Sequence, residues 1–504
     1  GATNAIGSNL DSYNSALNSS TVIDKSVDTT AEVRDLVNAY NTILKLADGG
    51  STTSTFATDQ QYQLIGVTGL DNPTTVLRTE KANLLSDAID RKSTTDVDTV
   101  DEVQALANAV IAVMKTVGGE KVLTKAQLEA LGVTGVTDAN LPALLDAIDG
   151  TAPDGTGANT VAKLQNLLTQ GAINSAITLI SNFAGDNQES SNTGDGRTFN
   201  SYIIRSGGRK PTVNDFATAG VLRVTVENID AINDALATKD ITALLTDTAV
   251  EIQSIVDAYN AVFALADVTV ENTTRTNPNT NNPPVTVEQF KGIGAQIGST
   301  PGNSNISLLN SVLDLRTSAE VDTVQEINTI FDVVSAIMDS TGNRSANSAA
   351  LLTVNNLTNK LGLGSINQTN IAGILNSIAK QANGDKIDTV AELQSLVNFY
   401  NAAAPTVVLA DDTGVNTADR LTRTANLTFG TPSFGGVKTE FSIDGGANYA
   451  LTSSYQAPQT TGSYTVLVRQ VSAEGYLGQS RSLTFNLDLK TPDAIRSEER
   501  RVGK

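Results

Sequence analysis

The sequence predicts a multidomain protein, mainly α-helical, in which tandem three-helix repeats precede one all-β sandwich domain. Three observations support this prediction. The phrase VDTVQEINTIF at 321–331 recurs in four other variants along the chain. Its apolar residues follow helical spacing, whereas residues 405–490 change to the alternation typical of β-strands. At 504 residues the chain is also too long for a single hydrophobic core.

Each copy of the phrase begins with a Thr that a Glu follows three residues later. The pairs are Thr29/Glu32, Thr99/Glu102, Thr248/Glu251, Thr323/Glu326 and Thr389/Glu392. This spacing predicts a capping box, in which the Thr hydroxyl and the Glu carboxylate satisfy free N–H groups of a helix start. The Asp before each Thr is expected to favour the positive end of the helix dipole. The weaker copy at 160–168 has Lys163 instead of Glu and is expected to lose half of the box.

Behind each cap, apolar residues recur at the spacing of one helix face. Counted from the Thr they fall at +4, +7, +8 and +11, as in Ile327, Ile330, Phe331 and Val334. Each copy is therefore predicted to be a long amphipathic helix with one buried face.

Two shorter elements are predicted between the copies. Short helices are expected to end at Gly132 and Gly220, and GVTG recurs at 66–69 and 132–135. A further helix follows each of them, with an Asn expected as its N-cap. These residues are Asn140, Asn228, Asn305 and Asn370.

The predicted organisation follows from this order of elements. Residues 1–27 form a partial repeat, and 389–404 a terminal helix stopped by Pro405. Between them lie the repeats 28–98, 99–159, 160–247, 248–322 and 323–388. The repeat 160–247 contains a loop insertion. The Asn-, Thr- and Gly-rich stretches 186–210 and 269–286 are expected to be surface loops.

Residues 405–490 are predicted to form an antiparallel sandwich with strands at 427–429, 439–443, 464–471 and 482–489. The segments LADDTGVNTADRLTRTANLTF, FSIDGGANY and YTVLVRQVSAEGYLGQSRSLTFNLD resemble the bacterial Ig-like repeats of giant cell-surface adhesins and other large exoproteins. The resemblance covers about 85 residues. The helical repeats are similar, more loosely, to helical arrays of the same kind of protein. The resemblance implies an Ig-like domain and an extracellular or cell-surface location.

Ig-like repeats of this type often hold Ca²⁺ at their junctions, and this makes three carboxylates candidate calcium ligands. Asp411, Asp412 and Asp419 follow the last helix, and Asp444 could assist them. A solvated acidic turn is the alternative. The acidic run DVDTVDE at 96–102 lacks the Gly and final Glu of an EF-hand loop.

Composition excludes several classes of function. There is no Cys and no His, so disulfides, thiolate zinc sites and Ser-His-Asp triads are impossible. A formal net charge of −20 argues against nucleic-acid binding. No apolar run reaches the ~18 residues of a membrane span, so no membrane insertion is expected in this segment. The Tyr-Asn pairs at Tyr40, Tyr259 and Tyr400 admit glycan binding, but core packing with the hydroxyl in water is favoured.

The predicted function is a noncatalytic stalk or spacer segment of a secreted or cell-surface adhesin-like protein. Its surface ligand, a glycan or protein, is expected to be bound elsewhere in the full-length protein. Two alternatives stay open: ligand binding through the long loops of the helical repeats, and an enzyme site in the insertion 186–226. The charged tail within 491–504 resembles translated sequencing-adaptor sequence and is expected to be no part of the function.

Overall fold

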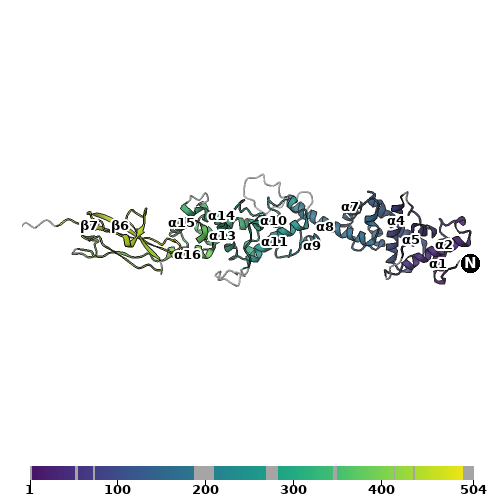
Figure 1. The fold of residues 1–504 in the computed structure, drawn as a ribbon, viewed down its shortest axis with the longest axis horizontal. Helices are drawn as coiled ribbons and strands as arrows, with labels where there is room; N and C mark the ends of the chain where they lie inside the picture. Colours follow the sequence, from purple (N-terminus) through teal and green to yellow (C-terminus); the bar gives the residue numbers. More distant parts are fainter. Residues whose placement is uncertain are drawn as a thin grey trace, which may run out of the picture. The chain divides into compact units, whose positions relative to one another are not determined.

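The computed structural model describes residues 3–50, 55–71, 74–186, 209–267, 282–343, 349–413, 415–434 and 437–491. The chain forms two compact units. Unit 1 comprises Gly1–Asp186, Phe199–Val224 and Ala243–Ile252, and unit 2 comprises Asn187–Thr198, Thr225–Thr242 and Gln253–Lys504. Helices fill the earlier part of the chain and strands follow only after them (Figure 1). The prediction of a helical array followed by a β region is therefore confirmed.

The helices repeat in the predicted order: a long helix, then a short helix, then a third helix of intermediate or variable length. The long helices are α2 (Thr30–Leu46), α5 (Val100–Val117), α8 (Val161–Asp186), α11 (Ala249–Leu265), α14 (Val324–Ser340) and α16 (Val390–Asn401). The short ones are α3 (Asp59–Leu64), α6 (Lys125–Leu131), α9 (Val213–Thr218), α12 (Val287–Gly292) and the π-helical turn η11 (Asn356–Lys360). The third ones are α1 (Leu10–Leu17), α4 (Thr75–Asp90), α7 (Leu141–Asp149), α10 (Ile229–Leu236), α13 (Asn303–Leu313) and α15 (Ile371–Ala379).

The five capping boxes are confirmed. In α14, for example, the Glu326 N–H donates to Thr323 Oγ1 at 3.3 Å, and the Thr323 N–H donates to the Glu326 carboxylate at 3.1 Å. The predicted face behind the cap is buried, with Ile327 and Val334 both at 0% exposure. At Lys163 only half of the box forms: its N–H donates to Thr160 Oγ1 at 3.2 Å. Gly132 ends α6 with a φ of +98°, as predicted.

The predicted asparagine N-caps act differently from the prediction. Asn140, Asn228 and Asn370 hold the N-cap position, but their side chains make no cap bond within the helix that follows. Their carboxamide oxygens instead accept from the N–H three residues earlier, as in the 2.7 Å bond from Thr137 to Asn140. They therefore close the preceding turn. Asn305 lies inside α13, whose N-cap is Gly302.

The β region contains two sheets. Its strands are β1 (Val407–Leu409), β2 (Leu421–Thr422), β3 (Leu427–Phe429), β4 (Lys438–Ser442), β5 (Ala450–Leu451), β6 (Gly462–Val471) and β7 (Arg481–Leu487). β1 pairs with β3, and the other sheet has the order β2-β7-β6-β4-β5. Both sheets contribute to one core, in which Val407 of β1 joins Val468 and Phe485.

Two details differ from the predicted antiparallel sandwich. β2 pairs with β7 in parallel, so the larger sheet is mixed. The last helix ends at Asn401, because Ala402 already has extended backbone angles, and so it stops before Pro405. Most of the predicted loop insertions, and the charged tail after Thr491, lie outside the described residues. Among the described helices, none combines the length and the apolar character needed to cross a membrane.

Candidate functional site

Two of the three tyrosines of the repeated Tyr-Asn pairs are core residues, whereas Tyr400 is half-buried. Tyr40 and Tyr259 are both 0% exposed. The Tyr40 hydroxyl donates to the Val97 carbonyl at 3.3 Å, and that of Tyr259 donates to the Val321 carbonyl at 3.1 Å. Each carbonyl lies two residues before the capping Thr of the following repeat. The expectation of a hydroxyl in water is wrong for these two rings, and neither ring surface is open to a glycan.

The asparagine after each tyrosine also bonds to another helix. Asn41, Asn260 and Asn401 accept from the side-chain amides of Asn9, Asn228 and Asn370 at 3.1, 2.7 and 2.9 Å. In each case the donor belongs to the start of a third helix and the acceptor to the long helix of the following repeat. The three Asn–Asn pairs therefore form the same seam between repeats.

A side-chain amide holds each GVTG turn. The Thr68 N–H donates to Gln104 Oε1 at 2.8 Å, and Gln104 Nε2 donates back to the Thr68 carbonyl at 3.3 Å. Thr134 and Gln165 make the same two bonds, at 2.9 and 3.0 Å. Both glutamines lie five residues after the capping Thr position of the next long helix. The verbatim repetition of GVTG thus reflects a turn that must pair with an amide.

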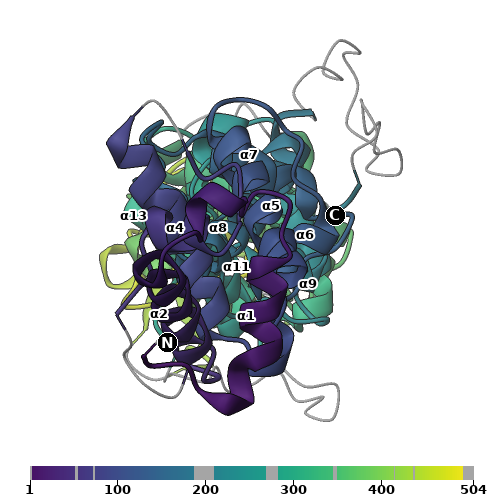
Figure 2. The same cartoon turned by 90° about the vertical axis from the view of Figure 1, so that its right-hand side faces the viewer.

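A further seam joins repeats that are not neighbours in sequence. The first N–H of a long helix has no partner within that helix. Here a Ser or Asp of the third helix two repeats earlier accepts from it, so that α1 lies against α5 as well as α2 (Figure 2). The bonds run from Val100 to Ser15 at 2.9 Å, from Val161 to Asp87 at 2.7 Å, from Val324 to Asp234 at 2.7 Å and from Val390 to Ser311 at 3.0 Å. At these four places a repeat is thus bonded to the repeat two further along the chain as well as to its neighbour.

The aspartates before the capping threonines do not behave as simple partners of the helix dipole. The pKa of Asp322 is raised above its ordinary value, first by burial and then by the nearby Glu326 carboxylate. Burial is also the largest cause of the raised pKa at Asp98 and Asp388. At Asp28 and Asp247 the capping Glu itself is the largest cause. Burial and the second carboxylate therefore both favour the neutral, protonated form of these aspartates.

The predicted calcium ligands mostly bond within their own loop. Asp412 Oδ2 accepts from the Arg420 N–H at 3.0 Å, and Asp419 Oδ1 accepts from the Leu421 N–H at 3.0 Å. Asp411 is exposed, and its backbone carbonyl accepts from the Thr422 hydroxyl. Asp412 Oδ1 is enclosed with no hydrogen-bond partner in the described part of the chain.

The other carboxylate considered for this site is used elsewhere. Asp444 closes the turn before β5, where it accepts from Ser442 and from Asn448 at 2.6 to 3.0 Å. No group of three or more acidic, His or Cys side chains placed to hold a metal occurs among the described residues. Calcium at this junction stays a prediction.

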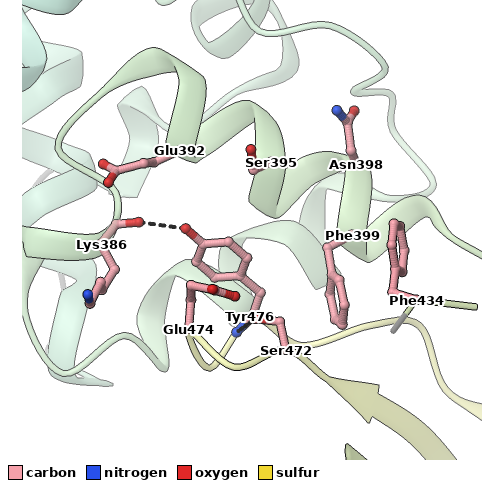
Figure 3. Close-up of a pocket in the computed structure, with 9 residues that line it drawn as sticks. All are labelled: Lys386, Glu392, Ser395, Asn398, Phe399, Phe434, Ser472, Glu474 and Tyr476. Atoms are coloured by element: carbon pink, nitrogen blue, oxygen red, sulfur yellow. Dashed lines mark hydrogen bonds between the residues drawn. The ribbon is translucent and has the colours of Figure 1, made fainter. Parts of the chain in front are cut away.

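A cleft of about 530 Å³ lies between α16 and the β region within unit 2 (Figure 3). Phe434, which is 45% exposed, stacks on Phe399 at 5.3 Å between ring centroids. The Tyr476 hydroxyl donates to the Lys386 carbonyl at 2.7 Å, and burial raises the pKa of Tyr476 to about 12.

Two polar side chains that line this cleft have structural partners. Glu392 belongs to the capping box of α16, and Ser395 Oγ donates to the Ala391 carbonyl at 2.8 Å. Together with the bond from Tyr476 to the Lys386 carbonyl, these contacts form a joint between two parts of unit 2.

Comparisons of the chain with protein-family models, with curated proteins and with solved structures found no match.

Proposed function

We propose that this chain is a noncatalytic spacer segment of a secreted or cell-surface bacterial protein of the giant adhesin type. In this role it extends a stalk and holds a distal ligand-binding module away from the cell. The observation that supports the proposal most is the use of the recurring polar residues. The Thr, Glu, Gln, Tyr and Asn of the repeated phrase bond to helix starts and to other repeats.

The joint to the β region supports the same role. The Leu477 N–H donates to Ser377 Oγ at 2.9 Å, and Gln381 Nε2 donates to the Gly475 carbonyl at 3.3 Å. Ser433 Oγ donates to the Ala403 carbonyl at 2.8 Å on another side of the joint. Together with the Phe399–Phe434 stack, these bonds resist bending between the last helix and the sheets. Such resistance is what a load-carrying stalk requires.

Small-angle X-ray scattering tests the spacer. A compact globule of this length has a radius of gyration near ~23 Å. Tandem repeats that contact near neighbours build quasi-linear structures, so we expect a much larger radius and a rod-like distance distribution. A radius near the globular value would contradict the proposal.

A cell-level experiment separates the spacer from the alternative of ligand binding by the array. The full-length protein is compared with a version in which residues 28–404 are replaced by an unrelated rigid helical spacer of equal length. A spacer role predicts retained adhesion after replacement and loss after simple deletion. Adhesion lost in both versions would favour ligand binding by the array, whose long loops lie mostly outside the described residues.

A further inference from the structure

The last long helix of the array, α16, is not followed by the kind of element that follows the other long helices. A short helix comes after each of α2, α5, α8, α11 and α14, whereas the next element after α16 is strand β1. A further long helix after α16 does not occur in the described part of the chain. The β region is what lies against the corresponding surfaces of α15 and α16.

Phe399 of α16 occupies a position that is buried in all five long helices with a complete capping box, ten residues after the capping Thr. The other four residues at this position, all at 1 to 3% exposure, are Ala39, Ala109, Ala258 and Val333. In α11 the short helix α12 lies against this position, since a Cβ placed on Gly292 would be 3.7 Å from Ala258 Cβ. In α16 the ring of Phe434 lies against Phe399 instead, with 5.3 Å between ring centroids (Figure 3). A ring of the β region thus gives α16 the cover that a short helix gives α11.

A backbone N–H of the β region also bonds to α15 as the first N–H of a long helix bonds to a third helix. The Leu477 N–H donates to Ser377 Oγ of α15 at 2.9 Å. At the start of α16, the Val390 N–H donates to Ser311 Oγ of α13 at 3.0 Å. Leu477 and Val390 are both 7% exposed, so a buried aliphatic residue makes the bond in each case. Counted from the repeated Asn, Ser377 lies one position further along its helix than Ser311, which moves the contact about 100° around the helix.

The turn that carries Leu477 is closed by bonds of its own. The Ser472 N–H donates to the Tyr476 carbonyl at 3.0 Å, and the Tyr476 N–H donates back to Ser472 Oγ at 3.0 Å. Gly475 supplies the positive φ of +91° that this tight turn requires. The turn 472–477 therefore presents the Leu477 N–H to α15 in a fixed direction, as the first turn of a helix would.

We propose that the β region is the end cap of the helical array, that is, the element that covers its last repeat. Phe434 takes the place of a short helix, and the turn 472–477 takes the place of the start of a further long helix. An array whose repeats contact near neighbours leaves one side of its last repeat without a neighbour, and repeat proteins close such an end with a capping element. The role goes beyond the spacer function, because a ligand-binding array would need the same cap.

Two consequences follow for the array. The stability of α15 and α16 depends on side chains of the β region, although the two parts have separate cores. The seam position that would receive a further long helix is also occupied, so the β region ends the array at α16.

Hydrogen exchange of the whole chain, followed by mass spectrometry, tests the cap with Phe434→Ala. We expect protection factors in α16 to fall about threefold to tenfold, the effect of losing one aromatic pair, while those of β6 stay unchanged. The matched control is Leu489→Ala. Leu489 is 43% exposed and Phe434 is 45% exposed, but Leu489 follows the end of β7 that pairs with Gly462, away from the turn 472–477. Leu489→Ala should leave α16 unchanged, and Phe434→Leu, which keeps an apolar cover, should cost less than Phe434→Ala.

Ser377→Ala tests the second contact. It leaves the Leu477 N–H without its acceptor, and a buried N–H without a partner should lower protection in α15 at least about tenfold. Ser377→Thr keeps a hydroxyl at this position and should remain near the parent chain.

Three results would overturn the proposal. Protection in α15 and α16 that survives both Phe434→Ala and Ser377→Ala would show that the array needs no cap. An equal loss in Leu489→Ala would show that any exposed apolar side chain of the β region has the same effect. A loss confined to β6 and β7 would show that the β region depends on the array and not the array on the β region.

Discussion

The aspartates at the seams of the helical array and those in the loops of the β region are used in opposite ways. Asp87 and Asp234 accept from helix starts that lie 74 and 90 residues further along the chain. Asp412, Asp419 and Asp444 accept from groups two to eight residues away. The array therefore shares its stability among repeats, whereas the loops of the β region are closed locally. A substitution that breaks a bond at one seam of the array should therefore destabilise neighbouring repeats as well. A substitution in a loop of the β region should have only a local effect.

The substitution expected to have the largest effect on stability is Tyr259→Ala, in the core of the array. The change removes a ring that is 0% exposed and the bond from its hydroxyl to Val321. We expect a loss of about 3–5 kcal/mol in the free energy of unfolding, typical of a large aromatic removed from a core. Urea unfolding measures it, and Tyr259→Phe, which removes only the hydroxyl, should cost about 1 kcal/mol.

Hydrogen exchange in the Tyr259→Ala chain tests whether the loss spreads. Amides of α14, in the next repeat, should lose protection together with those of α11, while those of β6 keep theirs. Faster exchange confined to α11 would show that the repeats are independent.

How far the sequence predicted this network depends on the range of each interaction. Thr323 and Glu326 are three residues apart, so their capping box follows from local spacing alone, and it is confirmed. The Tyr259 hydroxyl was predicted to face water, and this prediction is wrong. Helical periodicity places the ring on the buried face, but it cannot show that the Val321 carbonyl, 62 residues away, accepts from the hydroxyl. The glutamine partners of GVTG were missed for the same reason, although the verbatim recurrence of the turn was a usable signal.

The β region shows the same limit. Alternation in 464–471 correctly placed Val466 and Val468 on one buried face. The parallel pairing of β2 with β7 depends on a two-residue strand whose sequence carries no such alternation. Asp412 and Asp419, which were predicted as calcium ligands, each accept from a backbone N–H of their own loop, and proximity in sequence did not reveal these bonds.

A smaller effect is expected from Asp234→Ala at the seam between distant repeats. Asp234 is 4% exposed and accepts from the Val324 N–H at 2.7 Å. Its removal leaves a buried N–H without this acceptor, which costs about 1–3 kcal/mol in unfolding free energy. Asp234→Asn retains an oxygen acceptor and should cost less. An Asp234→Ala chain as stable as the parent would mean that the seam carries no coupling.

Acidification from pH 7 to pH 4 should affect a carboxylate of the array and not one of the β region. The raised pKa of Asp322 means that the folded chain binds its proton more tightly than the unfolded chain. This contribution to stability is present at low pH and is lost as pH rises through the folded-state pKa. Asp444 is the reverse case, because its hydrogen bonds to the Asn448 N–H and side chains of Ser442 and Asn448 hold its pKa far below 3.8. Its contribution is present above pH 3.8 and is lost only as pH falls through the lower folded-state value.

Protection factors corrected for intrinsic exchange rates measure both trends. Between pH 7 and pH 4 the first turn of α14 should gain protection, and the turn at 444–448 should not change. Asp322→Asn should flatten the first trend, because its amide does not titrate. Parallel changes in both segments would show that the two sets of carboxylates are not used differently.

Chelation is expected to have the smallest effect, since it acts on the region whose carboxylates are already used. Ca²⁺ takes about six to eight oxygen ligands. Asp412 offers one oxygen without a hydrogen-bond partner in the described residues, and Asp419 already accepts from a backbone N–H. We therefore expect EDTA to leave the thermal midpoint of the β region unchanged. A midpoint that falls with EDTA, recovers with calcium and no longer responds in Asp412→Asn would instead establish an ion at the junction. The carboxylates of the β region would then also join distant parts of the chain, and the contrast with the array would fail.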